Sequence, residues 1–298
     1  MGTRGGALWR PARNESATGV GSHTGDSMRL ALMVMLFTVA GCALEDDDDL
    51  AARPTEALRT LLVSQRHIQV GVRCQQDYQN GWQVDVGNND VWNRCSNFYN
   101  DDRQTEVAAF YFNLRGAKAA LEQPDTCGWA CGYADSVDVF YMNTHGGSSA
   151  TTAYWAMWDA YSNAYTSNMR LGSSGRQNMV LATFSCQTHA LDAATWNRWI
   201  RVFSGGMVFT VGGRDVLYSG QTQSGQEFSA RLDNGEPIGQ AWNESTWYAD
   251  NSNHPGAIVT GRNATDCWNR MGTTFDTLFS TPILRDGAIG YMCWTSWN

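Results

Sequence analysis

Four runs of almost continuous apolar residues dominate the hydrophobic pattern of the chain. Each run is about as long as a β-strand, and together they cover residues 107–112, 137–142, 179–184 and 206–212. Runs that are apolar at nearly every position are typical of strands buried on both faces of a parallel sheet. The segments between them are long enough for the helical crossovers that parallel strands require. The pattern therefore predicts one α/β domain with a mostly parallel central sheet.

Two further segments have the spacing of helices. Between residues 192 and 203 the apolar side chains recur at steps of three and four, and Asp192 stands where a helix cap is expected. A second helix is predicted over residues 237–248, with Trp242 facing the core. Residues 85–103, in contrast, are crowded with Asn, Asp and Gly, so the start of the domain is predicted to consist of strands and loops.

The N-terminal part of the chain has the features of an export signal. Arg29 precedes a short apolar run, residues 30–37, which leads through small residues to Cys42. A run of this length is too short to cross a hydrocarbon core of ~30 Å as a helix. Residues 39–42 resemble the lipobox of bacterial lipoproteins, whose cysteine accepts the lipid after cleavage. The sequence therefore predicts an exported protein that is lipid-anchored at Cys42 in the bacterial cell envelope, at the outer membrane or cell surface.

Composition predicts where the N-terminal segments and the folded domain begin and end. Residues 1–27 are rich in Gly, Arg, Ser and Thr, lie upstream of a better signal start at Met28, and are predicted to be an untranslated extension. The signal peptide then covers residues 28–41, an acidic tether covers residues 42–60, and the folded domain covers residues 61–298.

The charge of the chain argues against nucleic acid as a partner. The formal net charge is −8, and Lys118 is the single lysine. Proteins that bind a phosphate backbone do so with clustered Lys and Arg, and this chain has no basic stripe. The predicted partners are therefore a peptide or protein substrate and, through the N-terminal lipid, a membrane.

Eight cysteines add a second constraint. Cys42 is assigned to lipid and Cys186 to chemistry, which leaves six. In an exported protein an even number of cysteines is most simply explained by disulfides, and pairing between neighbours in sequence is the simplest of the many connectivities. Cys127 and Cys131 do not have Cys-x-x-Cys spacing and no second pair completes a zinc site, so no metal is expected. The candidate disulfide cysteines are Cys74, Cys95, Cys127, Cys131, Cys267 and Cys293.

The candidate chemistry lies where two of the predicted strands end. The run 137–142 leads into His145-Gly146, and the run 179–184 leads into Ser185-Cys186. In open α/β sheets, ligands bind in the crevice beyond the carboxyl ends of the strands. A histidine and a cysteine that leave adjacent strands at this edge can act on one substrate as a Cys–His dyad.

These two blocks resemble those of the caspase-like superfamily of cysteine peptidases, which includes caspases, legumains, clostripains and gingipains. In that superfamily one apolar strand leads to His-Gly and a later one leads to a small residue followed by Cys. Residues 137–146 and 179–186 match both blocks in the same order, and the resemblance covers roughly residues 105–262. Within the superfamily, residues 145–242 are similar to an uncharacterised family of secreted bacterial proteins of this fold.

The resemblance implies a three-layer α/β sandwich of the caspase–haemoglobinase type and a cysteine endopeptidase that needs no cofactor. Cys186 would attack the scissile carbonyl, and His145 would donate a proton to the leaving amine. The backbone N–H groups of Gly146 and Cys186 would form the oxyanion hole, where each preorganised donor typically contributes ~10²–10³ in rate. A thiol attacks well at neutral pH only with thiolate character, and His145 is the candidate for the cation that supplies it.

Simpler interpretations of the same residues stay open. His145-Gly146 can be an ordinary turn after a strand, and Cys186 can be a buried core thiol. His189 can be a residue at the entry to a helix or an auxiliary group beside the dyad. Asp138, on the strand that leads to His145, is a candidate for the acidic group that a basic substrate side chain would need.

Thirteen tryptophans support a different class of function. Several lie outside the predicted strands, among them Trp247, Trp268, Trp294 and Trp297. Core packing explains many such residues, but exposed aromatic side chains also form platforms for sugars or extended peptides. The alternative prediction is therefore a catalytically inactive caspase-fold surface lipoprotein that binds peptide or glycan through aromatic residues. A purely structural envelope protein, with Cys186 sealed in its core, is a third reading.

Overall fold

The computed structural model of the chain describes residues 68–75, 90–105, 107–112, 117–124, 126, 131–158, 163–173 and 178–297, all within the compact unit Pro54–Asn298. The predictions that concern residues 1–60, among them the signal peptide, the lipid acceptor Cys42 and the tether, lie outside the described residues, as does Cys127. Among the described residues, no helix has the length and apolar character to cross a membrane.

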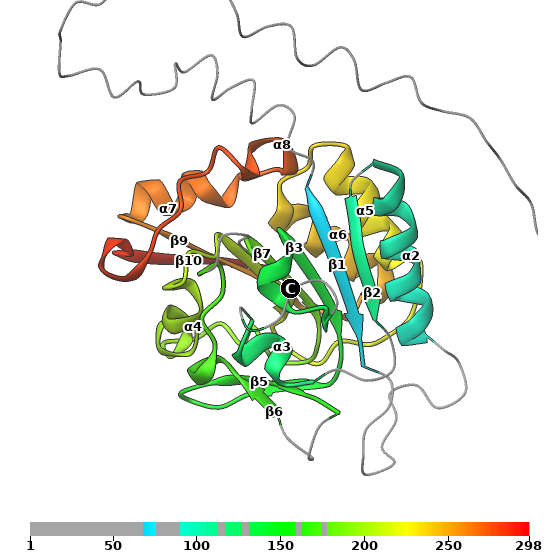
Figure 1. Cartoon of the computed structure of the whole chain (residues 1–298), viewed down its shortest axis with the longest axis horizontal. Helices are drawn as coiled ribbons and strands as arrows, with labels where there is room; N and C mark the ends of the chain where they lie inside the picture. Colours follow the sequence, from blue (N-terminus) through cyan, green and yellow to red (C-terminus); the bar gives the residue numbers. More distant parts are fainter. Residues whose placement is uncertain are drawn as a thin grey trace, which may run out of the picture. The chain divides into compact units, whose positions relative to one another are not determined.

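A seven-stranded sheet forms the centre of this unit (Figure 1). Its strands, in spatial order, are β10 (Tyr291–Ser296), β9 (Pro255–Gly261), β8 (Phe209–Gly213), β7 (Val180–Phe184), β3 (Val139–Asn143), β1 (Gln69–Cys74) and β2 (Val107–Phe112). The strands from β8 to β2 run parallel to one another, and β9 is antiparallel to both of its neighbours. Each of the four apolar runs overlaps one of these strands, so the predicted α/β class with a mostly parallel central sheet is confirmed.

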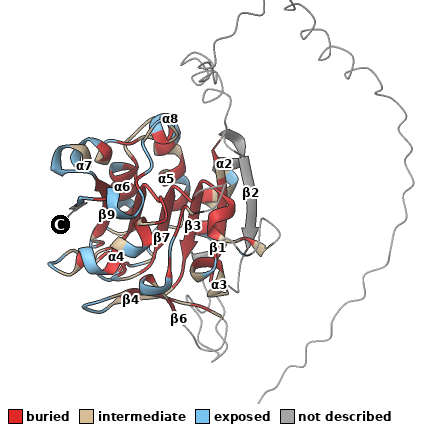
Figure 2. Cartoon of the chain, turned by 60° about the vertical axis from the view of Figure 1, so that its left-hand side comes forward, coloured by how far each residue is buried: buried red, intermediate tan, exposed pale blue. Residues whose placement is uncertain are grey.

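Both faces of the sheet are buried, which explains why the strands are apolar at nearly every position. Along β3 the side chains of Val139 and Tyr141 belong to one core cluster, whereas those of Phe140 and Met142 belong to another. Successive residues of a strand point to opposite faces, so each cluster lies on one face of the sheet. Figure 2 shows buried residues along the strands and exposed residues on the outer surfaces of the helices.

Five helices cover the face that carries Tyr141 (Figure 1). They are α2 (Asp90–Thr105), α5 (Ser224–Asp233), α6 (Ile238–Ala249), α7 (Ala264–Met271) and α8 (Phe275–Leu278). α6 confirms the helix predicted over residues 237–248, and Trp242 is buried as predicted. Its indole meets Phe228 edge to face with ring centroids 5.1 Å apart, and Tyr141 stacks on Phe98 of α2 at 4.3 Å. Aromatic contacts of this kind join the helices to the sheet.

A second layer covers the opposite face. It contains α3 (Ala119–Glu122), α4 (Thr195–Phe203) and a small antiparallel sheet of β4 (Gly146–Ser148), β5 (Ala153–Ala156) and β6 (Asn163–Tyr165). The 3₁₀ turns η2 (Ala134–Ser136), η4 (Thr166–Asn168) and η5 (Asp286–Ala288) lie in the connections. α4 confirms a helix within residues 192–203, but it begins at Thr195 and Ala194 occupies its N-cap, so the prediction that Asp192 caps it is wrong. Asp192 lies ahead of the helix and accepts a hydrogen bond from the Ala194 N–H at 2.8 Å. The buried Trp199 of α4 packs edge to face on Trp155 of β5, with centroids 5.9 Å apart.

The prediction of strands and loops over residues 85–103 is wrong from residue 90 onward, where α2 forms. The polar residues of this segment have a weak intrinsic helix propensity, but tertiary contacts outweigh it. Arg94, Cys95 and Phe98 are spaced to share one helix face, and all three are buried. Arg94 Nε also donates a hydrogen bond to Ser224 Oγ of α5 at 2.8 Å.

Two disulfides fasten helices to the sheet. Cys74–Cys95 joins β1 to α2, and Cys267–Cys293 joins α7 to β10. Both bonds join cysteines that are neighbours in sequence, as predicted, and Cys131 is disulfide-bonded as well. Structural disulfides form and persist in oxidising compartments, so the protein belongs to an extracytoplasmic environment.

Candidate active site at the carboxyl ends of the parallel strands

His145 and Cys186 lie at equivalent positions beyond two adjacent strands. β3 and β7 are parallel neighbours, and their last residues, Asn143 and Phe184, are paired in register. His145 comes two residues after Asn143, and Cys186 comes two residues after Phe184. The Thr144 N–H donates to the Phe184 carbonyl at 3.4 Å, which extends the pairing past the strands. Both residues therefore leave the same edge of the sheet, where α/β folds bind their ligands.

Gly146 packs directly against the segment that carries Cys186. A Cβ at this position would lie 3.0 Å from the Cys186 carbonyl oxygen, 3.0 Å from Ser185 Cβ and 2.5 Å from Thr188 Cγ2. Separations this short are repulsive, so a larger residue would push the two segments apart. The approach of the chain after β3 to the chain after β7 thus depends on a glycine.

The N–H of Gly146 is directed away from the small sheet. In the pairing of β4 with β5, Ala156 N–H donates to the His145 carbonyl at 2.9 Å, and Gly146 lies opposite Trp155. Hydrogen-bonded and non-hydrogen-bonded pairs alternate along antiparallel strands, so Gly146 occupies a non-hydrogen-bonded position. Its N–H therefore points to the open side of β4, which is an edge strand among the described strands of that sheet.

Cys186 is half-buried and is the only free cysteine in the described part of the chain. Its sulfur accepts a hydrogen bond from the Leu217 N–H at 3.4 Å and lies 3.8 Å from the Leu217 carbonyl oxygen. Leu217 follows β8, so the segment after a third parallel strand contacts the sulfur. This thiol is therefore neither disulfide-bonded nor sealed in the core.

The turn after Cys186 has an unusual backbone conformation. Gln187 has a φ of +54°, a left-handed value that non-glycine residues seldom adopt. Its N–H donates to the Asp215 carbonyl at 2.9 Å, and the Gly213 N–H donates to the Ser185 carbonyl at 3.2 Å. The β8 end thus holds this strained turn in place, as is common at ligand-binding and catalytic sites.

Two buried polar groups flank the dyad positions without a hydrogen-bond partner in the described part of the chain. They are Asn143 Nδ2, two residues before His145, and Ser185 Oγ, immediately before Cys186. Buried polar atoms are nearly always hydrogen-bonded, and each exception calls for an explanation. Both lie at the carboxyl edge of the parallel strands, beside the dyad positions.

A comparison with known protein families matches the part of the chain that contains the candidate site. The family model described as Domain of unknown function (DUF6345) matches residues 76–281, which is more than half of the chain. The chain belongs to the DUF6345 family. Both His145 and Cys186 lie inside the matched region, as do the strands that position them. A search of curated proteins found no match.

In this DUF6345 domain, His189 is a core residue. Its ring is fully buried, with Nδ1 3.1 Å from Thr188 Oγ1, Nε2 3.0 Å from Thr210 Oγ1, and its centroid 4.6 Å from that of Trp199. Burial lowers the pKa of His189 from 6.5 to about 3, so the imidazole is neutral. It lies ahead of α4 and not at its entry, and it fixes Thr188, whose methyl group lies against Gly146.

Asp138 lies at the other end of β3 from His145. It directly precedes the first residue of that strand, and its Oδ2 accepts a hydrogen bond from the Gln69 N–H at 3.0 Å. Seven residues of extended chain span more than about 20 Å, so the strand separates the two side chains. The DUF6345 fold therefore does not bring Asp138 to the dyad positions, and its carboxylate stabilises the start of β1 instead.

Sequence reasoning missed the contribution of the third strand end. The segment after β8 supplies Leu217, which contacts the sulfur of Cys186, and Asp215, which holds Gln187. Ligands of α/β proteins bind at the carboxyl ends of the parallel strands, and the run that becomes β8 was predicted as one of those strands. The segment after it could therefore have been included in the candidate site. Among the described residues, no group of His, Cys, Asp and Glu could hold a metal ion.

Proposed function

We propose that the DUF6345 domain is a cysteine peptidase-like hydrolase of the caspase type, in which His145 and Cys186 cleave peptide bonds. The observation that carries this proposal is the register of β3 with β7, together with the close packing of Gly146 on the Cys186 segment. It brings a histidine, a free half-buried cysteine and a glycine N–H to one edge of the sheet. The layered α/β architecture is compatible with the caspase-like superfamily.

In the proposed reaction the Cys186 thiolate attacks the carbonyl carbon of the scissile peptide bond. The carbonyl π electrons move onto oxygen, and the N–H groups of Gly146 and Cys186 stabilise that oxyanion. When the tetrahedral intermediate collapses, the C–N bond breaks and His145 donates a proton to the leaving amine. Water then attacks the thioester and gives a proton to His145; the C–S bond breaks, which releases the carboxylic acid and restores the Cys186 thiolate beside the His145 imidazolium.

Alkylation of the native protein is the first test of this proposal. The protein is treated with iodoacetamide without reductant, and modified peptides are located by mass spectrometry. We expect rapid modification at Cys186 alone and slower modification in the His145→Ala variant, because the imidazolium no longer stabilises the thiolate. Modification of Cys186 only after denaturation, or equal rates in both proteins, would overturn the dyad.

Hydrolysis is then measured with a library of fluorogenic peptides that varies the residue before the scissile bond. We expect Cys186→Ala and His145→Ala to lower the rate by at least about 10³-fold, as loss of a nucleophile or its partner does in other hydrolases. Asp138→Asn serves as the matched control, because that carboxylate lies at the far end of β3. Equal loss of activity in all three variants would point to misfolding and not to chemistry.

The export and anchoring of the protein form the second part of the proposal. We infer that Cys42 becomes the lipidated N-terminus and that the following acidic segment holds the domain away from the membrane. The described disulfides support export, since they need an oxidising compartment.

A catalytically inactive binding protein is the rival function. Several exposed tryptophans favour it, because large aromatic side chains on the surface often form binding platforms. It predicts that the peptide library is not cleaved even where Cys186 reacts with iodoacetamide.

A further inference from the structure

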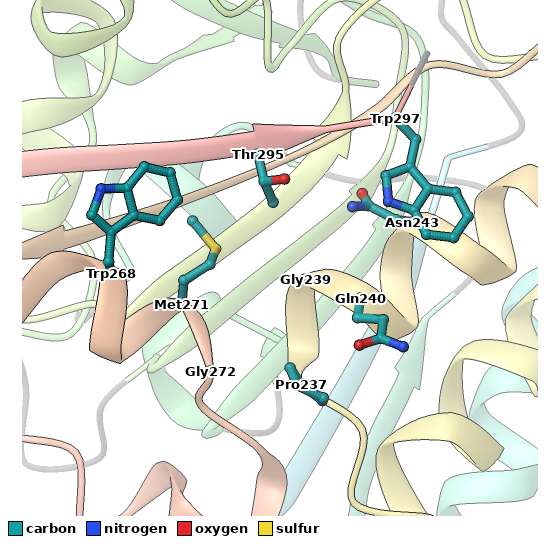
Figure 3. Close-up of a pocket in the computed structure, with 9 residues that line it drawn as sticks. All are labelled: Pro237, Gly239, Gln240, Asn243, Trp268, Met271, Gly272, Thr295 and Trp297. Carbon is teal, nitrogen blue, oxygen red and sulfur yellow. The ribbon is translucent and has the colours of Figure 1, made fainter.

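A second candidate site lies on α6, α7 and β10, apart from the residues of the proposed dyad. These elements enclose a pocket of about 410 Å³, within the range of roughly 300–1,000 Å³ that small-ligand pockets occupy. Figure 3 shows the nine side chains and backbone positions that line it. None of the described residues that line it carries a charge. The pocket therefore favours a neutral ligand.

Two exposed tryptophans form the ends of this pocket. Trp268 of α7 is 55% exposed and Trp297, just after β10, is 39% exposed. Figure 3 shows their indoles at opposite ends, with Met271 and Thr295 between them. Exposed indoles leave apolar area in water, and a flat ligand that covers them removes that area and gains dispersion contacts.

The floor of the pocket contains a polar group without a partner. Asn243 of α6 is only 2% exposed, and its Oδ1 has no hydrogen-bond partner in the described part of the chain. Figure 3 shows this amide turned toward the middle of the pocket. Nearby, Gln240 donates through Nε2 to Glu244 at 2.9 Å, which leaves its carbonyl oxygen as a second acceptor. The unpartnered acceptor on the floor thus calls for a ligand that donates a hydrogen bond.

We propose that this pocket binds a neutral saccharide, with sugar rings on Trp268 and Trp297 and ring hydroxyls on Asn243. A pyranose ring presents an apolar C–H face, which stacks on an indole, and equatorial hydroxyls, which both donate and accept hydrogen bonds. A proline-rich peptide also favours aromatic grooves, but it has few N–H groups to satisfy Asn243 Oδ1. Among its described lining residues the pocket offers no cation, which disfavours phosphate or acidic ligands.

Binding is tested on the intact purified protein with defined probes. Insoluble cellulose, chitin and peptidoglycan are used in pull-down assays, and cellohexaose and chitohexaose in isothermal titration calorimetry. Decaproline is the competing peptide probe. We expect at least one saccharide to bind and decaproline not to bind. Binding of decaproline alone, or of no saccharide up to millimolar concentration, would overturn the proposal.

Variants of the lining residues test whether the saccharide binds in this pocket. We expect Trp268→Ala and Trp297→Ala each to lower the affinity about ten-fold, and Asn243→Ser to lower it similarly, while Trp268→Phe retains part of it. Trp196→Ala is the matched control, because Trp196 is an exposed tryptophan of α4 on the opposite face of the sheet. Thermal unfolding establishes that each variant is folded. Saccharide affinity that survives in the Trp268→Ala/Trp297→Ala double variant would refute the assignment.

Discussion

Gly146 meets two requirements that no other residue type meets at once. Its missing side chain lets the segment after β3 approach Ser185 and Cys186, and its backbone N–H faces the open side of β4. A donor at this place stabilises an oxyanion only if its position is fixed before the reaction begins. The packing of two strand ends provides that fixed position, so one residue connects the fold to the proposed chemistry.

Gly146→Ala is therefore expected to impair both stability and activity. The added methyl group collides with Thr188 and with the Cys186 backbone, and overpacking of this kind costs about 1–3 kcal/mol. Displacement of the N–H should lower peptide hydrolysis by about 10²-fold. Urea unfolding and hydrolysis assays measure the two effects. Gly287→Ala is the control, since nothing lies within 4 Å of a Cβ at that exposed position; unchanged hydrolysis in Gly146→Ala would exclude an oxyanion role.

His189 makes the stability of the domain sensitive to acid. Its pKa is about 3 in the folded protein and about 6.5 in the unfolded chain, so between these values the unfolded state binds a proton that the folded state excludes. Stability from this residue is complete above pH 6.5 and is lost as the pH falls toward 3. The expected loss between pH 7.5 and pH 5.0 is about 2 kcal/mol in the free energy of unfolding.

Urea titrations at the two pH values test this expectation. His189→Gln should abolish most of the difference between them, even if the variant is less stable at pH 7.5. His254→Gln is the control for loss of an imidazole, because that side chain is 38% exposed. An unchanged pH dependence in His189→Gln would show that another group is responsible.

At the scale of elements, sequence reasoning succeeds where one local pattern determines the outcome. The runs that become β3 and β7 are apolar because both of their faces are buried, and their order fixes where His145 and Cys186 emerge. α2 was missed because its polar sequence becomes helical only through contacts with α5 and the sheet. In a parallel sheet the carboxyl ends of all strands lie at the same edge, and ligands bind at that edge. Once the sheet is predicted to be parallel, the location of the site follows.

The saccharide pocket shows what a linear pattern cannot reveal. Trp268 and Trp297 attract attention in the sequence, yet nothing local indicates that they face one pocket with Asn243. That arrangement depends on the antiparallel pairing of β10 with β9 and on the Cys267–Cys293 bond between α7 and β10. Contacts between elements distant in sequence therefore create the pocket, whereas the proposed dyad depends mainly on two neighbouring strands.

At the scale of the whole molecule, charge limits how the protein can be held at a membrane. With a formal net charge of −8 and a single lysine, the chain offers no basic cluster to attract anionic lipid headgroups. Each CH₂ of a buried acyl chain contributes about 0.8 kcal/mol, and more than one chain is needed for lasting attachment. In the proposed anchoring, lipid at Cys42 holds the protein at the membrane, so high salt should not release it.

The full chain, expressed with its own signal in a bacterial host, should partition into the detergent phase of Triton X-114 and yield an acylated N-terminal peptide that begins at Cys42. Cys42→Ser should move the protein to the aqueous phase, since no electrostatic attraction remains to hold it. Cys186→Ser, a cysteine replacement in the folded domain, should leave partitioning unchanged. A wild-type protein that stays in the aqueous phase with an unmodified N-terminus would show that export proceeds without the proposed anchor.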